Sequence, residues 1–208
     1  MLTFPRSRVL RLAAGALTVA SLLGAQAAGA RPRGPDDTRP LITALTPGQR
    51  ADLQHAVDDQ LAGGRGGRQS AANEVTYPDG AVVVLPLPGQ AQAPAWSGDT
   101  LRRGAAADAD WKQCPHDPAY YCFYQDINWG GRRLQFAAVY EQTPVSFTDY
   151  GFQDQTSSWV NTTRNLSVIV DMYEGADRWR MLWKEAPGSL SASVQEHDQA
   201  DRFWAVRE

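Results

Sequence analysis

Six of the seven tryptophans lie between Trp111 and Trp204, in the C-terminal half of this 208-residue chain. Aromatic side chains carry the largest buried areas in protein interiors, so their concentration predicts where the hydrophobic core lies. About 98 residues are enough for one compact domain. We therefore expect the core to belong to residues 111–208, preceded by a minor N-terminal segment.

Within residues 111–208, short runs of alternating apolar and polar side chains are separated by turn residues. One run extends from Leu166 to Tyr173, and another begins at Trp179 and ends before Pro187-Gly188. Alternation with a period of two is typical of half-buried strands, and closely spaced turns are typical of all-β domains. The pattern predicts an all-β fold.

Two stretches of this segment resemble each other. Residues 154–159 read Asp-Gln-Thr-Ser-Ser-Trp, and residues 198–203 read Asp-Gln-Ala-Asp-Arg-Phe. A repeat of about 45 to 49 residues that occurs only twice suggests two four-stranded Greek keys rather than a solenoid.

The first copy of the repeat carries a recognisable motif. Phe123-Tyr124, then Gly130-Gly131, then residues 153–158 resemble the βγ-crystallin motif of an aromatic corner, a hairpin glycine and a serine that pins the hairpin. The wider arrangement of residues 114–136 and 150–161 resembles the secreted actinobacterial peptidase inhibitor family I36, whose characterised member blocks metallopeptidases. The resemblance implies a βγ-crystallin-like double Greek-key sandwich over residues 111–208, and an inhibitor that blocks the cleft of a secreted peptidase with a rigid loop.

The second copy departs from this motif. The Trp179-Arg180 region stands where the hairpin glycine is expected after Tyr173, and Asp201-Arg202 replaces the serine pair. The residues between the two expected strands should therefore form an exposed loop, which is our candidate inhibitory loop; drift in a solvated hairpin explains the same departure equally well. The candidate contact residues of this loop are Glu174, Asp177, Arg178, Trp179 and Arg180. The family's reactive bond has no clear match in this sequence.

Residues 1–30 have the layout of a cleavable signal peptide. Three arginines precede an uncharged apolar run, and Ala28-Gly29-Ala30 provides small residues at the cleavage site. We expect export to the cell exterior, cleavage after Ala30 and no membrane association afterwards. Cleavage removes three of the 20 basic residues and none of the 23 acidic ones, which leaves a net charge of −6. Nucleic-acid binding needs clustered basic residues, so it is not expected.

Residues 31–110 are expected to form a leader, a short helix, a β-hairpin and a linker, and are a candidate pro-segment. Thr46-Pro47 predicts the start of the helix and Gly63-Gly64 predicts its end. Pro78-Asp79-Gly80 is turn chemistry between the strand-like runs 74–77 and 81–85. The Pro- and Gly-rich run 86–110 is the expected linker.

Cys114 and Cys122 are the only cysteines, and in an exported chain they predict a disulfide. Closing a loop of this length stabilises the fold by roughly 2.5 kcal/mol on the chain-entropy model. A zinc site is a weaker alternative because zinc needs four ligands.

Calcium is the one cofactor that the resemblance raises as a possibility to be weighed. Acidic and hydroxyl oxygens suit Ca²⁺, and the candidate ligands are Asp154, Ser157, Asp198 and Asp201. The motif is incomplete, because Gln153 stands where Asn or Asp is expected and the second copy lacks the hydroxyl. We expect no calcium binding, or binding weaker than about 10⁻⁴ M; local hydrogen bonding is the alternative role for these residues.

No catalytic residues are assigned, and an enzyme is not expected. The chain has no HExxH or GxSxG motif, and His197-Asp198 has no visible third partner. The alternatives to a monomeric inhibitor are a structural or calcium-binding crystallin-like module and a carbohydrate-binding domain. The latter would use exposed members of the set Trp129, Trp159, Trp179, Trp183 and Trp204.

Overall fold

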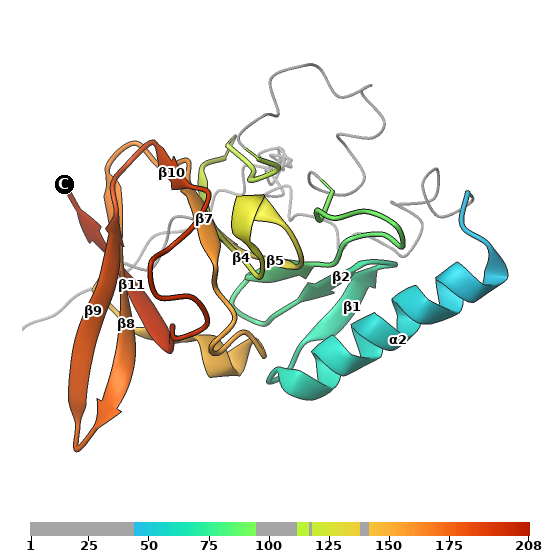
Figure 1. The fold of residues 1–208 in the computed structure, drawn as a ribbon, viewed down its shortest axis with the longest axis horizontal. Helices are drawn as coiled ribbons and strands as arrows, with labels where there is room; N and C mark the ends of the chain where they lie inside the picture. The colour runs from blue at the N-terminus through green and yellow to red at the C-terminus, as the bar shows by residue number, and fades with distance from the viewer. Residues whose placement is uncertain (1–43, 95–111, 117, 138–141) are drawn as a thin grey trace, which may run out of the picture. The chain divides into compact units, whose positions relative to one another are not determined.

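The structure is a computed structural model of the chain, and it describes residues 44–94, 112–116, 118–137 and 142–208 (Figure 1). All of these belong to one structural unit, residues 32–208. The predicted signal peptide, the leader 31–40 and most of the predicted linker lie outside the described residues. In the described part of the chain, no helix has the length and apolar character needed to cross a membrane.

The strands form two antiparallel sheets. Sheet 1 has seven strands in the order β1-β2-β3-β5-β4-β7-β10, and sheet 2 has four in the order β6-β11-β8-β9. The strands of sheet 1 are β1 (Arg68–Ala71), β2 (Glu74–Thr76), β3 (Val82–Val84), β5 (Arg133–Ala137), β4 (Tyr120–Tyr124), β7 (Ser158–Asn161) and β10 (Ser189–Ser191). Those of sheet 2 are β6 (Val145–Ser146), β11 (Arg202–Arg207), β8 (Leu166–Gly175) and β9 (Arg178–Glu185).

Each key contributes one strand to the sheet that the other key mainly forms. The first key comprises β4 to β7, but β6 pairs with β11 in sheet 2. The second key comprises β8 to β11, but β10 pairs with β7 in sheet 1. The all-β fold and its two Greek keys are therefore confirmed.

The core lies between the two sheets and is rich in aromatic rings. Phe203 of β11 lies 4.9 Å from Phe123 of β4 and 4.7 Å from Phe136 of β5, measured between ring centroids. Tyr121 stacks on Phe136 at 5.6 Å. These rings are fully buried, as alternation on facing sheets requires.

Helix α2 (Pro47–Gly63) begins and ends where the sequence predicts. The Thr46 hydroxyl accepts a hydrogen bond from the Gln49 backbone N–H, and the Gln49 side chain accepts one from the Thr46 N–H. This reciprocal capping box satisfies two backbone donors that a helix end leaves without partners. Leu53 and Val57 form the buried stripe.

The predicted hairpin is also present, but it does not stand apart from the main domain. Strand β3 pairs with β5, placing Val83 opposite Leu134, and Val57, Val75 and Val83 join the same buried cluster as the inter-sheet rings. The prediction that the core belongs to residues 111–208 alone is therefore wrong. The edge of β5 would otherwise expose unpaired backbone groups, and the hairpin covers it. The domain boundary at residue 110 stays a prediction.

The first residues after the hairpin fold against sheet 1. The fully buried guanidinium of Arg133 donates to the carbonyls of Ala93 and Pro94 at 3.4 and 3.0 Å, and to Gln135 Oε1 at 2.8 Å. A buried charge needs such partners. The start of the predicted linker is thus bound to the domain through Arg133.

The predicted disulfide between Cys114 and Cys122 is confirmed, with a Cα–Cα distance of 5.9 Å. It lies on the face of sheet 1 that points away from sheet 2, where Tyr120, Tyr124 and Val160 form a second buried cluster around it.

Candidate functional site

The β4–β5 hairpin of the first key is folded back on itself. Its turn contains η1 (Ile127–Trp129), and the Ser158 hydroxyl donates to the carbonyl of Asp126 at 2.6 Å and accepts from the backbone N–H of Trp129 at 3.1 Å. Gly131 has a φ of +68°, and a Cβ there would lie 2.8 Å from the Gln125 Cβ. The serine that pins the hairpin is therefore Ser158, and the glycine that permits the fold is Gly131.

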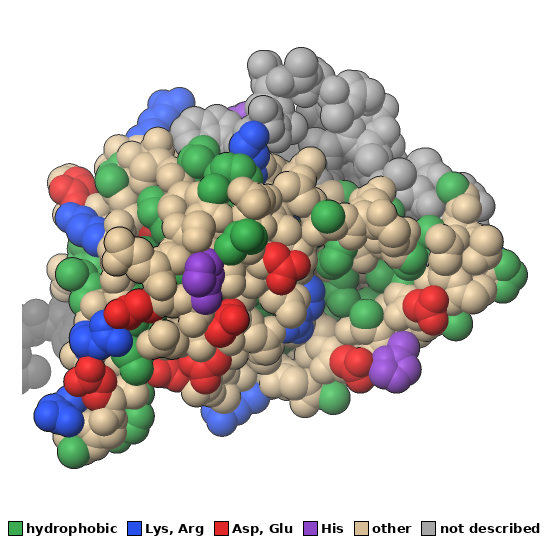
Figure 2. Space-filling view, viewed as in Figure 1, with side chains coloured by type: hydrophobic (Ala, Val, Ile, Leu, Met, Phe, Trp, Pro, Cys, Tyr) green, Lys and Arg blue, Asp and Glu red, His purple; other side chains and the backbone are tan. Residues whose placement is uncertain are grey.

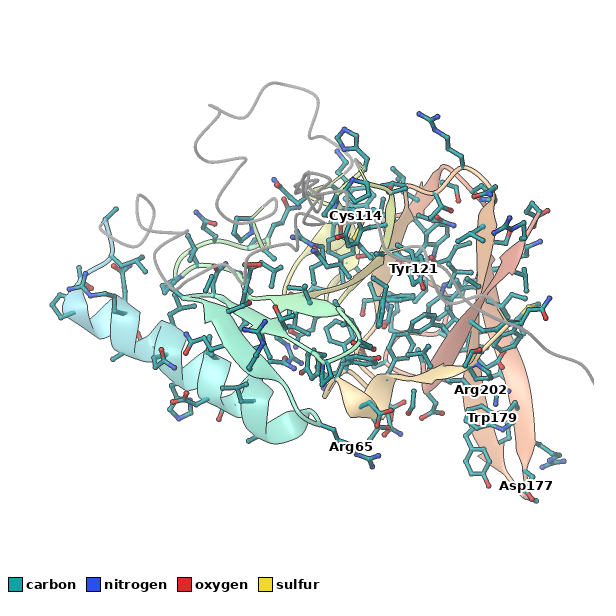
Figure 3. The ribbon with its side chains drawn as sticks, turned by 180° about the vertical axis from the view of Figure 1, so that it is seen from behind. Arg65, Cys114, Tyr121, Asp177, Trp179 and Arg202 are labelled. Carbon is teal, nitrogen blue, oxygen red and sulfur yellow. A yellow bond between two sulfur atoms is a disulfide. The ribbon has the colours of Figure 1, made fainter. Side chains whose placement is uncertain are left out.

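The β8–β9 hairpin of the second key is not folded back on itself, although its pairing has register shifts after Val170 and Tyr173. Its turn consists of Ala176 and Asp177, with φ values of 50° and 58°, a left-handed pair that joins two strands with the correct twist. Figures 1 and 3 show the hairpin extending past β11, with Asp177 at its tip. We call residues 173–181 the prong.

The structure of the prong differs from the exposed inhibitory loop that the sequence predicts. Of its five predicted contact residues, only Asp177 lies in the turn, since Glu174 belongs to β8 and residues 178–180 begin β9. The predicted loop is instead a pair of strands, because the two-residue turn lets hydrogen bonding continue almost to the tip.

Three large apolar side chains of the prong are exposed to solvent. The exposed fractions are 46% for Tyr173, 41% for Trp179 and 57% for Met181. Tyr173 and Trp179 are direct cross-strand partners, with ring centroids 5.1 Å apart. Met181 follows Trp179 by two positions and so points from the same face of β9.

Arg202 holds Trp179 in place. In the repeat, Arg202 occupies the position of Ser158, and its guanidinium carbon lies 3.5 Å from the centroid of a Trp179 ring. Its Nε and Nη2 both donate to Asp171 Oδ2 at 3.1 Å. Burial raises the pKa of Asp171, and the hydrogen bond from Arg202 opposes that rise. Figure 3 shows Arg202 beside Trp179 at the base of the prong.

Arg180 lies in the prong between two carboxylates. Its Nε donates to Glu174 at 2.9 Å, and its Nη1 donates to both oxygens of Glu196 at 2.9 and 2.8 Å. The Glu196 hydrogen bond is the main cause of a raised Arg180 pKa. The two strands of the prong are thereby tied to the loop that precedes β11.

A shallow acidic hollow of about 350 Å³ lies at the base of the prong. It is lined by Gln153, Asp154, Met172, Tyr173, Asp198, Gln199 and Asp201. Asp154 and Asp198 occupy equivalent positions in the repeat and have nearly equal φ values of 53° and 55°. The Asp154 N–H donates to Ala200 and the Asp198 N–H to Thr156, at 3.1 and 3.4 Å.

The structure brings the four candidate calcium residues together, but Asp201 is bound to groups outside the set and Ser157 is bound to Asp198. Asp201 accepts from Gln153 Nε2 at 2.7 Å and from the Tyr173 N–H at 2.6 Å, and the Ser157 hydroxyl donates to Asp198 at 3.3 Å. Burial raises the pKa of Asp154, and the charges of Asp201 and Asp198 add to the rise. Among the described residues, no group of three or more His, Cys, Asp or Glu has the geometry to hold a metal ion.

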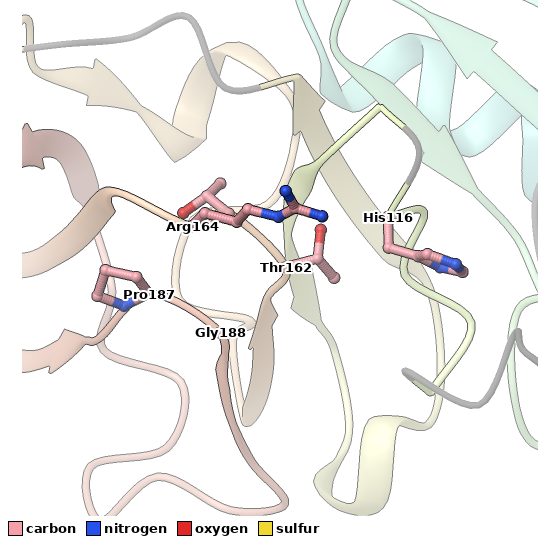
Figure 4. A pocket seen from close by; sticks show the side chains of 6 residues that line it. His116, Thr162, Arg164, Pro187 and Gly188 are labelled. Atoms are coloured by element: carbon pink, nitrogen blue, oxygen red, sulfur yellow. The ribbon is translucent and has the colours of Figure 1, made fainter.

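A second hollow of about 350 Å³ is lined by His116, Thr162, Thr163, Arg164, Pro187 and Gly188 (Figure 4). Its threonine hydroxyls are committed to the fold, since Thr162 donates to Pro115 at 2.8 Å and Thr163 to Asn161 at 2.6 Å. Figure 4 shows Arg164 extended toward Thr162 and His116 turned away. The exposed side chains of Arg164 and His116 therefore do not converge on one point.

The remaining sequence candidates are dispersed. Trp159 is buried and Trp179 is exposed, while Trp129, Trp183 and Trp204 are half-buried. His197 lies 3.3 Å from the Ser193 hydroxyl through Nε2, a contact that the sequence did not predict. Both side chains are exposed. Within the described ranges, no carboxylate holds the other ring nitrogen, so the third group of a catalytic triad is missing there.

Known proteins resemble parts of this chain. A solved structure of a beta gamma crystallin from Ciona intestinalis is similar over 43% of this chain and 99% of its own, with 15% sequence identity and a TM-score of 0.31. No curated protein is significantly similar in sequence. The family described as Peptidase inhibitor family I36 matches residues 107–178, which span the disulfide, the first key and β8. The resemblance to peptidase inhibitor family I36 that the sequence predicts is therefore confirmed over residues 107–178.

Proposed function

We propose that this protein is a secreted inhibitor of peptidases, with metallopeptidases as its targets. The observation that carries the proposal is the family match over residues 107–178. It ends at Arg178, inside the prong, and so includes β8 and the turn of the only long exposed hairpin among the described residues. The choice of metallopeptidases rests on the characterised member of the family.

A rigid contact element is the physical requirement of such an inhibitor. A surface that is already ordered loses little conformational entropy on binding. The prong meets this requirement, because Arg202 fixes Trp179 and two carboxylates fix Arg180. Inhibition without cleavage also favours a hydrogen-bonded hairpin over a loose loop.

Export is the second part of the proposal, and it rests on residues 1–30. The purified extracellular protein should begin at Arg31, because Ala28-Gly29-Ala30 precedes it. N-terminal sequencing tests this directly. Recovery of the chain with Met1 intact from the culture medium would contradict it.

The direct test of inhibition uses the chain from Arg31 to Glu208 against purified metallo-, serine and cysteine peptidases. We expect stoichiometric inhibition of at least one metallopeptidase at micromolar inhibitor. Equal rates with and without the protein across the whole panel would reject the proposal.

The calcium-binding alternative has a specific observation against it, since both carboxylate oxygens of Asp201 already accept protein hydrogen bonds. Calorimetry should give no binding tighter than about 10⁻⁴ M, and micromolar affinity would favour the structural-module function. The carbohydrate alternative would use exposed tryptophan rings, and Arg202 leaves Trp179, the one exposed member of the five candidate tryptophans, at most one free face.

A further inference from the structure

We infer that the prong docks into an apolar cleft of the target peptidase that is rimmed by lysine and arginine side chains. This inference rests on the proposed inhibitory function and adds the chemistry of the partner's surface. The chemistry of the partner's surface is inferred from three properties of the prong: its exposed apolar area, its rigidity and the charge around it.

The exposed apolar area is concentrated on the prong. Five large apolar side chains are exposed in the described part of the chain, and three of them, Tyr173, Trp179 and Met181, belong to the prong. Contiguous exposed apolar side chains mark interaction sites more often than scattered ones do. Tryptophan and tyrosine are also enriched among residues that dominate binding free energies.

The aromatic side chains are held in one arrangement before any partner arrives. Trp179 contacts both the guanidinium of Arg202 and the ring of Tyr173. Arg202 is itself fixed by Asp171, whose side chain is only 3% exposed. Docking therefore costs little side-chain entropy.

The prong is surrounded by more negative than positive charge. Six carboxylates belong to the prong or to the turns at its base, against three guanidinium groups, those of Arg178, Arg180 and Arg202. The acidic residues are Asp154, Glu174, Asp177, Glu196, Asp198 and Asp201. Figure 2 shows acidic side chains gathered around the lower left of the molecule, where the prong lies in Figure 1. Interfaces pair opposite potentials, so the partner's rim is basic.

The negative charge around the prong also argues against a second copy of the chain as its binding partner. A second copy of the chain would bring the same excess of carboxylates to the contact, and like charges at an interface are unfavourable. A flat sugar ring would find one face of Trp179 already covered by Arg202. An apolar cleft with a basic rim satisfies both the aromatic side chains and the carboxylates.

The test measures inhibition constants for the chain 31–208 and its variants, against a peptidase that the unaltered protein inhibits. Trp179→Ala and Tyr173→Ala should each weaken inhibition at least tenfold. Ile127→Ala and Leu190→Ala are matched controls, because these side chains are 51% and 42% exposed but lie on η1 and β10. Both controls should leave the constant within twofold.

A second arm tests the charge of the partner. Asp177→Asn removes the carboxylate at the tip and keeps a side chain that tolerates the left-handed turn. It should lower the association rate severalfold at low ionic strength, and the difference should vanish at about 1 M salt because charges are then screened. Asp52→Asn, on the exposed face of α2, should leave the rate unchanged.

Each outcome decides the inference. If the unaltered protein inhibits a peptidase and the prong variants inhibit it equally well, the inhibitory function stands and the prong is not its contact surface. If Asp177→Asn raises the association rate, the inference that the rim of the cleft is basic is wrong. If Trp179→Ala removes a dimer of the free protein, a second copy occupies the prong. If the unaltered protein inhibits no peptidase, the function and this inference fail together.

Discussion

The central strands of sheet 1 are buried on both faces, whereas the edge strand β9 of sheet 2 is largely open to solvent. Every residue of β4 and β7 is buried, but β9 has one buried residue among eight, Glu185. The outer face of sheet 1 lies under the disulfide segment and the residues that follow β3, which form two further buried clusters. The outer face of sheet 2 carries Trp179 and its exposed neighbours. Sheet 1 therefore mainly stabilises the fold, whereas sheet 2 offers a surface that is free to bind.

The two hairpins show how this difference arises from the same repeat. Ser158 folds the β4–β5 hairpin back over the first key, and Gly131 permits the tight approach. In the second key, Arg202 stands where Ser158 would be and stacks on Trp179 instead of binding the hairpin backbone. An aromatic prong therefore projects where the first key has a closed turn.

The largest expected effect comes from removing the cover of sheet 1. A chain lacking residues 44–94 would lose α2, β1, β2 and β3, expose the edge of β5 and leave Arg133 without the carbonyls of Ala93 and Pro94. The guanidinium would then be exposed to water, but the buried valines of the segment and the rings that they cover would lose their apolar packing, at roughly 25 cal/mol per Å² of apolar area exposed. We expect loss of cooperative unfolding and aggregation.

Circular dichroism and size-exclusion chromatography test this against the chain 31–208. A truncated protein that is monomeric and melts at the same temperature would show that the N-terminal segment is dispensable. It would also restore residues 111–208 as an independent inhibitor domain, as the sequence alone suggests.

The sequence predicts the local features of this fold well and the non-local ones poorly. Thr46, Pro47 and Gly64 define α2 because capping depends on neighbours in sequence. The pairing of β3 with β5 joins segments about 50 residues apart, and no local pattern encodes that choice. The sequence alone therefore confines the core to too few residues.

The same limit applies to the candidate site. Aligning the repeat identifies the position of Arg202, but its contacts with Trp179 and Asp171 depend on the register of three strands. The turn at Ala176-Asp177 was predicted as a longer loop, because two non-glycine residues with positive φ are uncommon. Arg202 could have been suspected from its place in the repeat alone.

The next largest effect separates the two faces of sheet 2. Phe203 of β11 is fully buried and contacts four aromatic rings, so Phe203→Ala should lower the free energy of unfolding by about 3 to 5 kcal/mol. Met181→Ala removes an exposed side chain and should change it by less than about 0.5 kcal/mol. Urea unfolding measures both. Similar losses would mean that the outer face of sheet 2 is covered.

A smaller effect concerns the disulfide on the outer face of sheet 1. Replacing Cys114 and Cys122 together by Ala opens a loop with a sequence separation of 8 and should cost roughly 2.5 kcal/mol on the chain-entropy model. Thermal melting under oxidising conditions measures the loss. If addition of a reductant lowers the melting temperature of the unaltered protein but not of the double variant, the effect comes from the bond. An unchanged double variant would show that packing alone holds this face.

The most gradual effect is a pH dependence at Glu185, the buried end of the open strand β9. Its Oε1 accepts from the Trp183 indole N–H at 3.1 Å, and among the described residues its Oε2 has no hydrogen-bond partner. Burial raises the pKa of Glu185 well above its ordinary value, and the indole bond only partly opposes this. The folded state therefore keeps a proton that the unfolded state releases above about pH 4.3, so stability is full below that pH and is lost as pH rises, by up to about 1.4 kcal/mol per pH unit.

Glu185→Gln should abolish this loss, because glutamine stays neutral and its carbonyl still accepts the indole hydrogen bond. The difference in the free energy of unfolding between the variant and the unaltered protein should grow from pH 5 upward until the folded-state pKa is passed. Glu208→Gln is the control with the opposite sign, since hydrogen bonds from Lys184 and Ser167 lower the pKa of Glu208. Its carboxylate stabilises the fold at neutral pH and loses that contribution as pH falls. A constant difference for Glu185→Gln across this range would mean that water reaches the carboxyl and that β9 is open along its whole length.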